Sequence, residues 1–285
     1  MRIEHHFVSA GFAALKPEWN DLVHRSCCDT LFLTWEWQST WWQHLGEGEL
    51  LLLGFRHEED GRLIGIAPLF GCQQAGRPQL NVVGCRDVSD YLDLIVEVGQ
   101  EQAVYGALLD YLESDGPEWE SFDLCNIPEA SLTYTRLREM AEERGYQTLV
   151  QVEDVCPIIE LPNTWDEYLA LLDKKQRHEI RRKLRRAEGG ADARFTVVGP
   201  EHDLQAEMVE FVDLHQKSTP EKDAFMDPEM QGFFYAVAQA LHERGWLQLC
   251  FLEIQGVKSA SLLNFDYGDA ILVYNSGYDP TRFAH

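Results

Sequence analysis

A run of basic residues at positions 174–186 is the part of this sequence best suited to bind an anion. The run holds eight Lys and Arg side chains and a single acidic residue, Glu179. Three of the arginines, Arg177, Arg181 and Arg185, follow one another at intervals of four residues. The guanidinium group is planar and can hold a phosphate or a carboxylate through paired hydrogen bonds. The run therefore indicates contact either with a phosphate or with the acidic surface of the protein itself.

The basic run lies on a predicted amphipathic helix that spans residues 165–188. No Pro or Gly interrupts this range, and Leu169, Leu172, Ile180 and Leu184 fall on one face at 100° per residue. Like charges at helical spacing repel each other by roughly 0.2 to 0.5 kcal/mol per pair. A bound anion would relieve that repulsion. A helix whose charged face is solvated or paired internally is the alternative, because most charge runs are of that kind.

Charge and composition limit the classes of partner. The formal net charge is -24 although the basic run is strongly positive, so the rest of the chain is acidic. An acidic body disfavours general binding to nucleic acid or to anionic membranes. The sequence has no apolar stretch of the roughly 18 residues that a membrane span requires and no signal-peptide pattern. We therefore expect a cytoplasmic protein.

The cysteines predict neither a disulfide nor a metal site. No two of them form a C-x-x-C pair, and their number is odd. The seven positions are Cys27, Cys28, Cys72, Cys85, Cys125, Cys156 and Cys250.

Polar residues on a predicted strand at 91–96 are candidates for substrate contact. Successive side chains of a strand point to opposite faces, so Asp90 and Asp93 cannot act as a carboxylate pair. Tyr91 and Asp93 share a face, and either could contact a sugar or an amine. Polarity at the edge of a sheet is the alternative explanation.

The order of the predicted elements repeats once along the chain. A strand, a turn at Asp60-Gly61 and a second strand form a predicted hairpin at residues 50–70, and the same plan recurs at residues 247–265. A predicted helix precedes each hairpin. The repetition indicates two similar α/β (α+β) domains, each with a mixed, mostly antiparallel sheet flanked by helices.

We place the boundary between the domains after residue 155. The N-terminal domain spans residues 1–155, and the C-terminal domain spans residues 156–285 and begins with a strand and the basic helix. After its hairpin the C-terminal domain has room for little more than one further strand, at 270–276. We therefore expect the second domain to be incomplete at its C-terminus.

Short segments spread over most of the chain carry a resemblance to a known family. They are residues 32–37 (FLTWEW), 41–42 (WW), 60–61 (DG), 67–69 (APL), 89–93 (SDYLD), 161–162 (LP), 214–215 (LH) and 274–280 (YNSGYDP). As a set they resemble the acetyltransferase-like proteins of the GNAT superfamily associated with cellulose and exopolysaccharide biosynthesis. These proteins are distant relatives of the Fem-type peptidyltransferases. The resemblance implies tandem GNAT-like domains that move an acyl group from a thioester, such as acetyl-CoA, to an amine or a hydroxyl without a metal.

The implied chemistry needs few special groups, because a thioester is already activated. The enzyme must place the acceptor, remove its proton and offer backbone N–H groups to the developing oxyanion. We expect the N–H donors on the strand at 270–276, a base at Asp279 or His215, and a proton donor at Tyr278. An Asp before a Pro is equally typical of a turn, and a lone His is often structural. In the family, a loop and a helix that would hold the donor's pyrophosphate follow this turn, and this sequence does not include them.

The Fem-type relatives use acceptors that carry a diphosphate. The resemblance therefore assigns Arg177, Arg181, Arg182 and Arg185 to a phosphate or another anionic group of a small-molecule, glycan or lipid-linked acceptor. One alternative is a non-catalytic GNAT-like protein that binds a nucleotide or a phosphate-bearing ligand in a polysaccharide system. A second alternative is a Fem-like transferase that uses aminoacyl-tRNA, the one role in which nucleic acid would be a partner. Motifs of serine hydrolases, zinc proteases, P-loop NTPases and dinucleotide-binding enzymes are missing.

Overall fold

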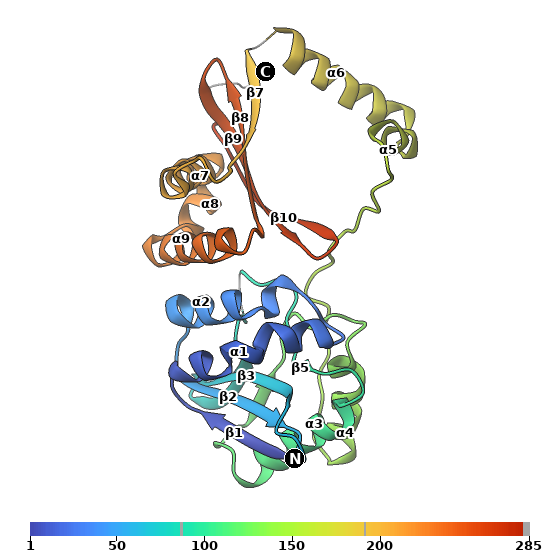
Figure 1. Ribbon diagram of the computed structural model, residues 1–285, viewed down its shortest axis with the longest axis vertical. Helices are drawn as coiled ribbons and strands as arrows, with labels where there is room; N and C mark the ends of the chain where they lie inside the picture. The colour runs from blue at the N-terminus through green and yellow to red at the C-terminus, as the bar shows by residue number, and fades with distance from the viewer. Residues whose placement is uncertain (86–87, 191, 282–285) are drawn as a thin grey trace. The chain divides into compact units, whose positions relative to one another are not determined.

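A computed structural model describes residues 1–85, 88–190 and 192–281 (Figure 1). It contains two sheets, and each is flanked by helices. All strand pairs are antiparallel except one. The predicted mixed α/β class is therefore confirmed.

The chain forms two compact units that do not follow one another simply along the sequence. The first unit consists of Met1–Gln151 together with Pro228–Glu243. The second consists of Val152–Asp227 and Arg244–His285. The division of the chain into two similar domains, at residues 1–155 and 156–285, therefore stays a prediction.

The first unit is built on a six-stranded sheet. Its strands are β1 (Arg2–His6), β2 (Glu49–Arg56), β3 (Leu63–Gln74), β4 (Arg77–Val82), β5 (Ile95–Val96) and β6 (Ser121–Asp123). The order is β1-β2-β3-β4-β6, with β5 paired to β3, and the pair β4–β6 is parallel. The predicted hairpin forms between β2 and β3. Its turn contains Gly61 with φ +71°, a conformation that glycine adopts without steric cost.

Helices and two short turns complete the first unit. They are α1 (Ala10–Arg25), a 3-10 turn (Leu31–Leu33), α2 (Trp35–Leu45), α3 (Glu101–Ser114), the π-helical turn η2 (Thr133–Leu137), α4 (Arg138–Glu143) and α9 (Pro228–Glu243). Thr34 caps α2 by accepting a hydrogen bond from the backbone N–H of Trp37. Trp19 and Trp37 are both 0 % exposed. These two indole rings therefore lie in the core of the first unit.

Helix α9 comes from the C-terminal half of the sequence but packs in the first unit. The rings of Phe233 on α9 and Trp37 on α2 meet edge to face at 5.5 Å. Phe233 and Phe234 are 0 % exposed. Burying an aromatic side chain of this size stabilises a fold by roughly 1.5 to 3 kcal/mol, so α9 is an integral part of the first core.

The second unit is built on a four-stranded antiparallel sheet of order β10-β9-β8-β7. Its strands are β7 (Ala193–Val197), β8 (Leu247–Ile254), β9 (Val257–Tyr267) and β10 (Ala270–Tyr278). The predicted hairpin at 247–265 forms as β8 and β9. Helix α7 (Leu204–Ser218) packs on β9 and β10 and is followed by α8 (Pro220–Phe225).

The predicted single helix at 165–188 is wrong, because the structure has two. Helix α5 (Trp165–Leu171) ends before Leu172, and α6 (Lys174–Gly190) begins after Asp173. The Asp173 carboxylate accepts the N–H of Gln176 at 2.8 Å, and the Gln176 side chain accepts the N–H of Asp173 at 3.3 Å. This reciprocal capping box starts a new helix. The Asp-x-x-Gln spacing at 173–176 is a sequence signal for this second helix start.

Three further expectations are corrected. The strand predicted at 91–96 forms only at Ile95–Val96. The strand expected to open the second domain is missing, since residues 156–162 have no strand pairing and Ile158 is 82 % exposed. A disulfide, which was not expected, joins Cys85 to Cys125 with 6.0 Å between their Cα atoms. Spacing along the sequence could not show that these two cysteines meet in the fold.

Candidate functional site

An irregularity in β10 marks the centre of the candidate site in the second unit. Val273 pairs with Asn264, but the next pair joins Asn275 to Leu263, so Tyr274 is an extra residue on β10. A bulge of this kind interrupts the ladder and redirects the neighbouring side chains. The Tyr274 ring packs against Phe265 with centroids 4.8 Å apart. Strand β10 also forms one edge of the described sheet.

His215 lies on α7 beside this bulge and is 1 % exposed. The rings of Phe211 and Phe225 lie 5.8 Å and 6.1 Å from its imidazole. Its Nδ1 atom has no hydrogen-bond partner among the described residues. Burial, assisted by the charge of Lys222, lowers the pKa of His215 to about 4, although a hydrogen bond with Asn275 opposes the shift. The imidazole is therefore neutral at physiological pH.

Lys222 was not among the predicted site residues, but the structure places it at the same bulge. Its Nζ donates to the backbone carbonyl of Ser276 and lies 3.4 Å from the Ser276 hydroxyl. Burial lowers the pKa of Lys222. Thr219 caps α8, and Pro220 stands at its start, which fixes Lys222 in the first turn. The sequence Thr-Pro-x-Lys would have predicted the helix start, but not the contact with β10.

Tyr278 is the last residue of β10, and Asp279 follows it directly. The backbone N–H of Tyr278 donates to the Ser218 hydroxyl at 2.9 Å, which ties the end of β10 to the end of α7. The Tyr278 side chain is 49 % exposed. The Asp279 carboxylate accepts the N–H and the hydroxyl of Thr281 at 2.9 Å and 2.6 Å. Asp279 therefore shapes the turn, the role that its position before Pro280 also suggested.

Asp279 also lines a polar hollow of about 360 Å³ in the second unit. Acidic side chains from α7 and from the β8–β9 hairpin, Glu210, Asp213 and Glu253, line the same hollow. Lys217 and Lys258 accompany them and pair with carboxylates of Asp213 and Glu207 respectively. His215 is not among the residues that line this hollow.

The part of the chain that holds this geometry matches a known domain. Residues 174–285 match the model of the acetyltransferase (GNAT) domain. This segment is GNAT-like. Over 99% of its length the chain is also similar to the crystal structure of FemX, with a TM-score of 0.62, 14% identity and 81% of that chain covered.

A second solved structure has a similar fold. It is a conserved protein of unknown function from Bacteroides thetaiotaomicron VPI-5482, with a TM-score of 0.52, 13% identity, and coverage of 98% of this chain and 81% of that one. At these identities the two structures show a shared fold and nothing finer. A comparison with curated proteins found no match.

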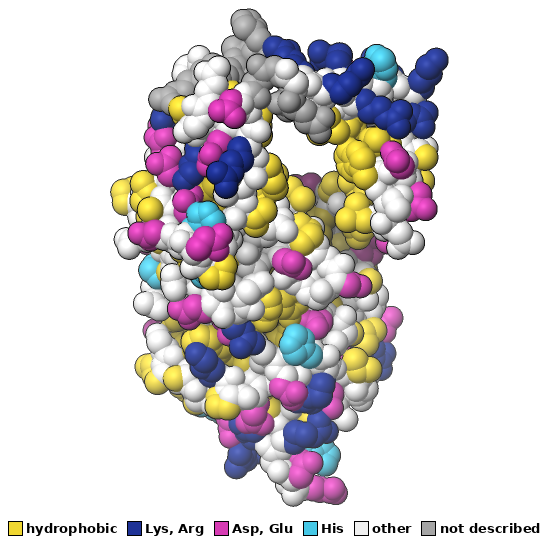
Figure 2. Space-filling view, turned by 45° about the horizontal axis from the view of Figure 1, so that its top comes forward, with side chains coloured by type: hydrophobic (Ala, Val, Ile, Leu, Met, Phe, Trp, Pro, Cys, Tyr) yellow, Lys and Arg dark blue, Asp and Glu magenta, His cyan; other side chains and the backbone are white. Residues whose placement is uncertain are grey.

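Helix α6 opens the GNAT-like segment and presents its basic residues to solvent. Figure 2 shows Lys and Arg side chains gathered along this helix. Arg182 pairs with Glu179, with nitrogen to oxygen distances of 2.7 Å and 2.9 Å. Arg177 and Arg181 have no carboxylate within ion-pair distance among the residues that the structure describes. The Arg185 side chain donates to the backbone carbonyl of Arg181 at 3.2 Å.

Tyr91 and Asp93 lie in the first unit, and their surroundings differ. Asp93 is 1 % exposed, and its carboxylate accepts the Ser131 hydroxyl at 2.5 Å and the N–H of Leu94 at 2.8 Å. Burial raises the pKa of Asp93. The Tyr91 ring is partly exposed and lies 6.0 Å from that of Phe32. The assignment of these two residues to substrate contact stays a prediction.

The described residues contain neither a bilayer-spanning helix nor a group of metal ligands. None of their helices combines the length and the apolar character that crossing a bilayer would require. None of their His, Cys, Asp and Glu side chains form a group of three or more that could hold a metal ion.

Proposed function

We propose that the chain is an acyltransferase that moves an acyl group from acyl-CoA to an amine or a hydroxyl of an anionic or sugar-containing acceptor. The observation that carries the proposal is the bulge at Tyr274 in the GNAT-like segment, with His215 and Lys222 beside it. A thioester needs a positioned acceptor, a proton acceptor and N–H donors for the oxyanion. The bulge region contains groups for each of these tasks.

The backbone of β10 is the proposed source of the oxyanion donors. The pairing of β10 with β9 shifts by one residue at Tyr274, so the peptide groups of β10 that follow the bulge are offset from the register that precedes it. Lys222 holds the carbonyl of Ser276, two residues further along. This contact would fix the orientation of the following peptide groups and bring a positive charge close to the developing oxyanion.

Of the two predicted bases, His215 and Asp279, His215 is in the ionisation state that suits a proton acceptor. Its pKa of about 4 keeps the ring neutral and able to accept a proton at pH 7. Because the ring is 1 % exposed, we propose that it acts through a bridging water. Asp279 remains a candidate, although Thr281 already occupies its carboxylate. Tyr278 is half-exposed and is the proposed proton donor.

Helix α6 is the proposed binding element for the anionic part of the acceptor. Arg177, Arg181 and Arg185 are exposed or partly exposed on one flank, at the spacing that lets several guanidinium groups approach one phosphate. Arg182 also belongs to the proposed set, but its guanidinium is shared with Glu179. A glycan precursor or a lipid-linked diphosphate would supply such a group.

The decisive experiment measures binding of acetyl-CoA by calorimetry and release of the free CoA thiol with amino sugars as acceptors. We expect binding by the wild type, and loss of turnover with retained binding in His215→Asn. His242→Asn on α9 is the matched control and should behave as the wild type. Retained nucleotide binding without any acetyl-CoA binding would support the non-catalytic alternative. Transfer from a charged tRNA instead would support the Fem-like one.

A further inference from the structure

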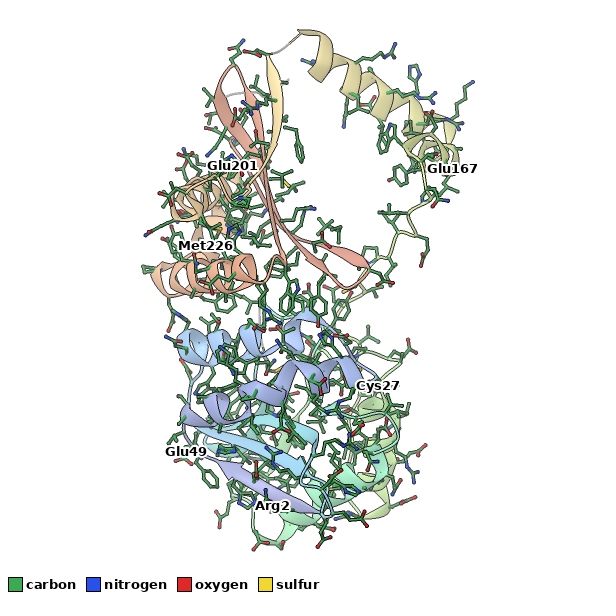
Figure 3. The ribbon with its side chains drawn as sticks, in the orientation of Figure 1. Arg2, Cys27, Glu49, Glu167, Glu201 and Met226 are labelled. Atoms are coloured by element: carbon green, nitrogen blue, oxygen red, sulfur yellow. A yellow bond between two sulfur atoms is a disulfide. The ribbon has the colours of Figure 1, made fainter. Side chains whose placement is uncertain are left out.

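Two adjacent cysteines lie in the loop that follows α1 in the first unit. Cys27, which is labelled in Figure 3, is exposed. Cys28 is partly buried. Their Sγ atoms are 3.9 Å apart, within the range of a sulfur hydrogen bond. Cys85 and Cys125 are already bridged to each other, and Cys156 is exposed with no cysteine adjacent in sequence. The loop therefore holds one exposed thiol and one partly buried thiol at contact distance.

A buried carboxylate lies beneath this pair. The Cys28 thiol accepts a hydrogen bond from Cys27 and lies close enough to the Asp93 carboxylate to lower the pKa of that group against the effect of burial. Asp93 itself is held by Ser131 at 2.5 Å and by the N–H of Leu94 at 2.8 Å. Because Cys27 donates to Cys28, the S–H of Cys28 is available to the Asp93 carboxylate. Asp93 can therefore accept the proton of Cys28 when Cys28 reacts.

The same contacts make Cys27 the more reactive thiol. The hydrogen bond with Cys28 lowers the pKa of Cys27 to about 7, against the opposing effects of burial and of the negative charges on Asp93 and Glu101. The thiolate is the nucleophilic form of cysteine. An exposed thiol that is substantially ionised near pH 7 is thus placed beside a second thiol that retains its proton.

The surrounding backbone is also unusual. The turn η2 (Thr133–Leu137) is π-helical, and such turns are rare and often lie at functional sites. The hydroxyl of Thr133, at its start, is hydrogen bonded to that of Tyr105 at 3.0 Å. The backbone N–H of Thr133 donates to the Ser131 hydroxyl, which in turn donates to Asp93. The dithiol is therefore part of an ordered network.

We propose that Cys27 and Cys28 form a redox-active dithiol that reduces low-molecular-weight disulfides. In the first step the Cys27 thiolate attacks one sulfur of the disulfide, forms a mixed disulfide and releases one thiolate. In the second step Cys28 gives its proton to Asp93 and attacks Sγ of Cys27, which releases the second thiolate. Asp93 then returns the proton to solvent. The small disulfide gains two electrons, and the two cysteines become a vicinal disulfide.

This bond would be readily reversible. Adjacent Cα atoms are only about 3.8 Å apart across a trans peptide bond, and disulfides usually span roughly 4.4 to 6.8 Å between Cα atoms. A disulfide outside the preferred geometry is more easily reduced. The pair is therefore suited to repeated oxidation and reduction, in contrast to a structural bridge.

The test exposes the full-length protein, after mild reduction, to oxidised glutathione and maps its peptides by mass spectrometry. We expect the wild type to lose two hydrogens across Cys27 and Cys28, and Cys28→Ser to keep one glutathione on Cys27. Cys27→Ser should not react at position 28. Cys156 is the internal control, because an exposed thiol without a neighbour should stop at the mixed disulfide.

A second measurement does not depend on forming the vicinal bond. Phenylarsine oxide links two thiols through arsenic and releases water, so the wild type should bind it at this loop and either single serine variant should lose that binding. Asp93→Asn should slow closure of the mixed disulfide without slowing its formation. A wild type that retains glutathione on Cys27 and binds the arsenical no better than Cys28→Ser would overturn the proposal.

Discussion

Gly277 on β10 lies directly against the backbone of His215 on α7. A Cβ atom built at position 277 would stand 2.5 Å from the backbone N of His215 and 2.9 Å from its Cα. Both neighbours are main-chain atoms of a helix, so they cannot turn aside as a flexible side chain would. Because position 277 has no side chain, α7 can approach β10 closely. This close approach places the His215 imidazole beside the bulge.

Gly277→Ala should destabilise the second unit and separate α7 from β10. Overpacking of this kind typically costs about 1 to 3 kcal/mol, and urea unfolding measures it. Gly71→Ala on β3 is the matched control, since its nearest neighbour would lie at an ordinary 3.9 Å. Equal stability of Gly277→Ala and Gly71→Ala would show that the two elements are not in contact as described.

The ionisation of His215 predicts how stability depends on pH. The pKa of the folded state is about 4, and that of an unperturbed histidine is about 6.5. Above pH 6.5 the ring is neutral in both states, and stability is complete. As the pH falls from 6.5 to 4, the unfolded chain takes up a proton that the folded chain does not. The free energy of unfolding should therefore decrease by up to about 3 kcal/mol.

Urea unfolding of the wild type and of His215→Gln between pH 4 and pH 7 checks this. The decrease attributable to His215 should be missing in His215→Gln, and His242→Gln should retain the wild-type profile. An NMR titration that finds the ring protonated above pH 6 would contradict the buried, neutral histidine.

Lys222 should influence the imidazole through its charge. The positive charge of Lys222 is the second cause of the lowered pKa of His215. Lys222→Met should therefore raise the pKa of His215, while Lys222→Arg should keep it low. Lys222→Met also leaves the Ser276 carbonyl without its charged donor, which should cost about 1 to 3 kcal/mol of stability. NMR of the His215 ring in the three proteins separates the electrostatic effect from the structural one.

The basic helix offers a matched pair of arginines for testing anion binding. Arg182 already pairs with Glu179, whereas Arg181 has no carboxylate partner among the described residues. Arg181→Ala should weaken binding of inorganic pyrophosphate by about 1.5 to 3 kcal/mol, the value of a hydrogen bond to a charged group. Arg182→Ala should have a smaller effect. Calorimetry at low and high salt measures both, and the difference should shrink as salt screens the charges.

Equal affinities for pyrophosphate in the wild type and both variants at low salt would show that the helix is only a solvated surface. That result would leave the acyl-transfer proposal at β10 untouched, because it concerns the acceptor and not the donor.

The sequence predicted those features that local patterns determine. The two hairpins, at 50–70 and 247–265, followed from alternating apolar strands and glycine-containing turns, and both form. The position of α9 could not be predicted, because its packing against Trp37 joins residues almost two hundred positions apart. The bridge between Cys85 and Cys125 was missed for the same reason.

The candidate site also combines residues that the sequence predicted with residues that it did not. His215 and Tyr278 were identified from a resemblance, and the structure brings the elements that carry them together through Ser218. Lys222 was missed because a lone lysine on a short helix has no distinctive spacing, and its role depends on contact with Ser276. Asp93 was expected on the face of a strand, but burial and hydrogen bonds to Ser131 place it inside the first unit.

The break between α5 and α6 supplies a final prediction, because it decides where the basic helix begins. Asp173 accepts the N–H of Gln176, and an N-cap of this kind contributes about 1 kcal/mol to a helix. Asp173→Ala should therefore fray the first turn of α6, and the amides of residues 174–177 should exchange hydrogen faster. Asp166→Ala, inside the first turn of α5, is the control, because Thr164 and Glu167 form the capping box there.

Asp173→Asn keeps a capping oxygen and should restore slow exchange. If the helix continued from 165 to 188, the substitution of Asp173 by Ala would instead replace a poor helix former with a good one and slow the exchange. The sign of the change in hydrogen exchange at 174–177 therefore distinguishes two short helices from one long helix. Only the two-helix arrangement lets Arg177 lie in the first turn of a separately oriented cationic element.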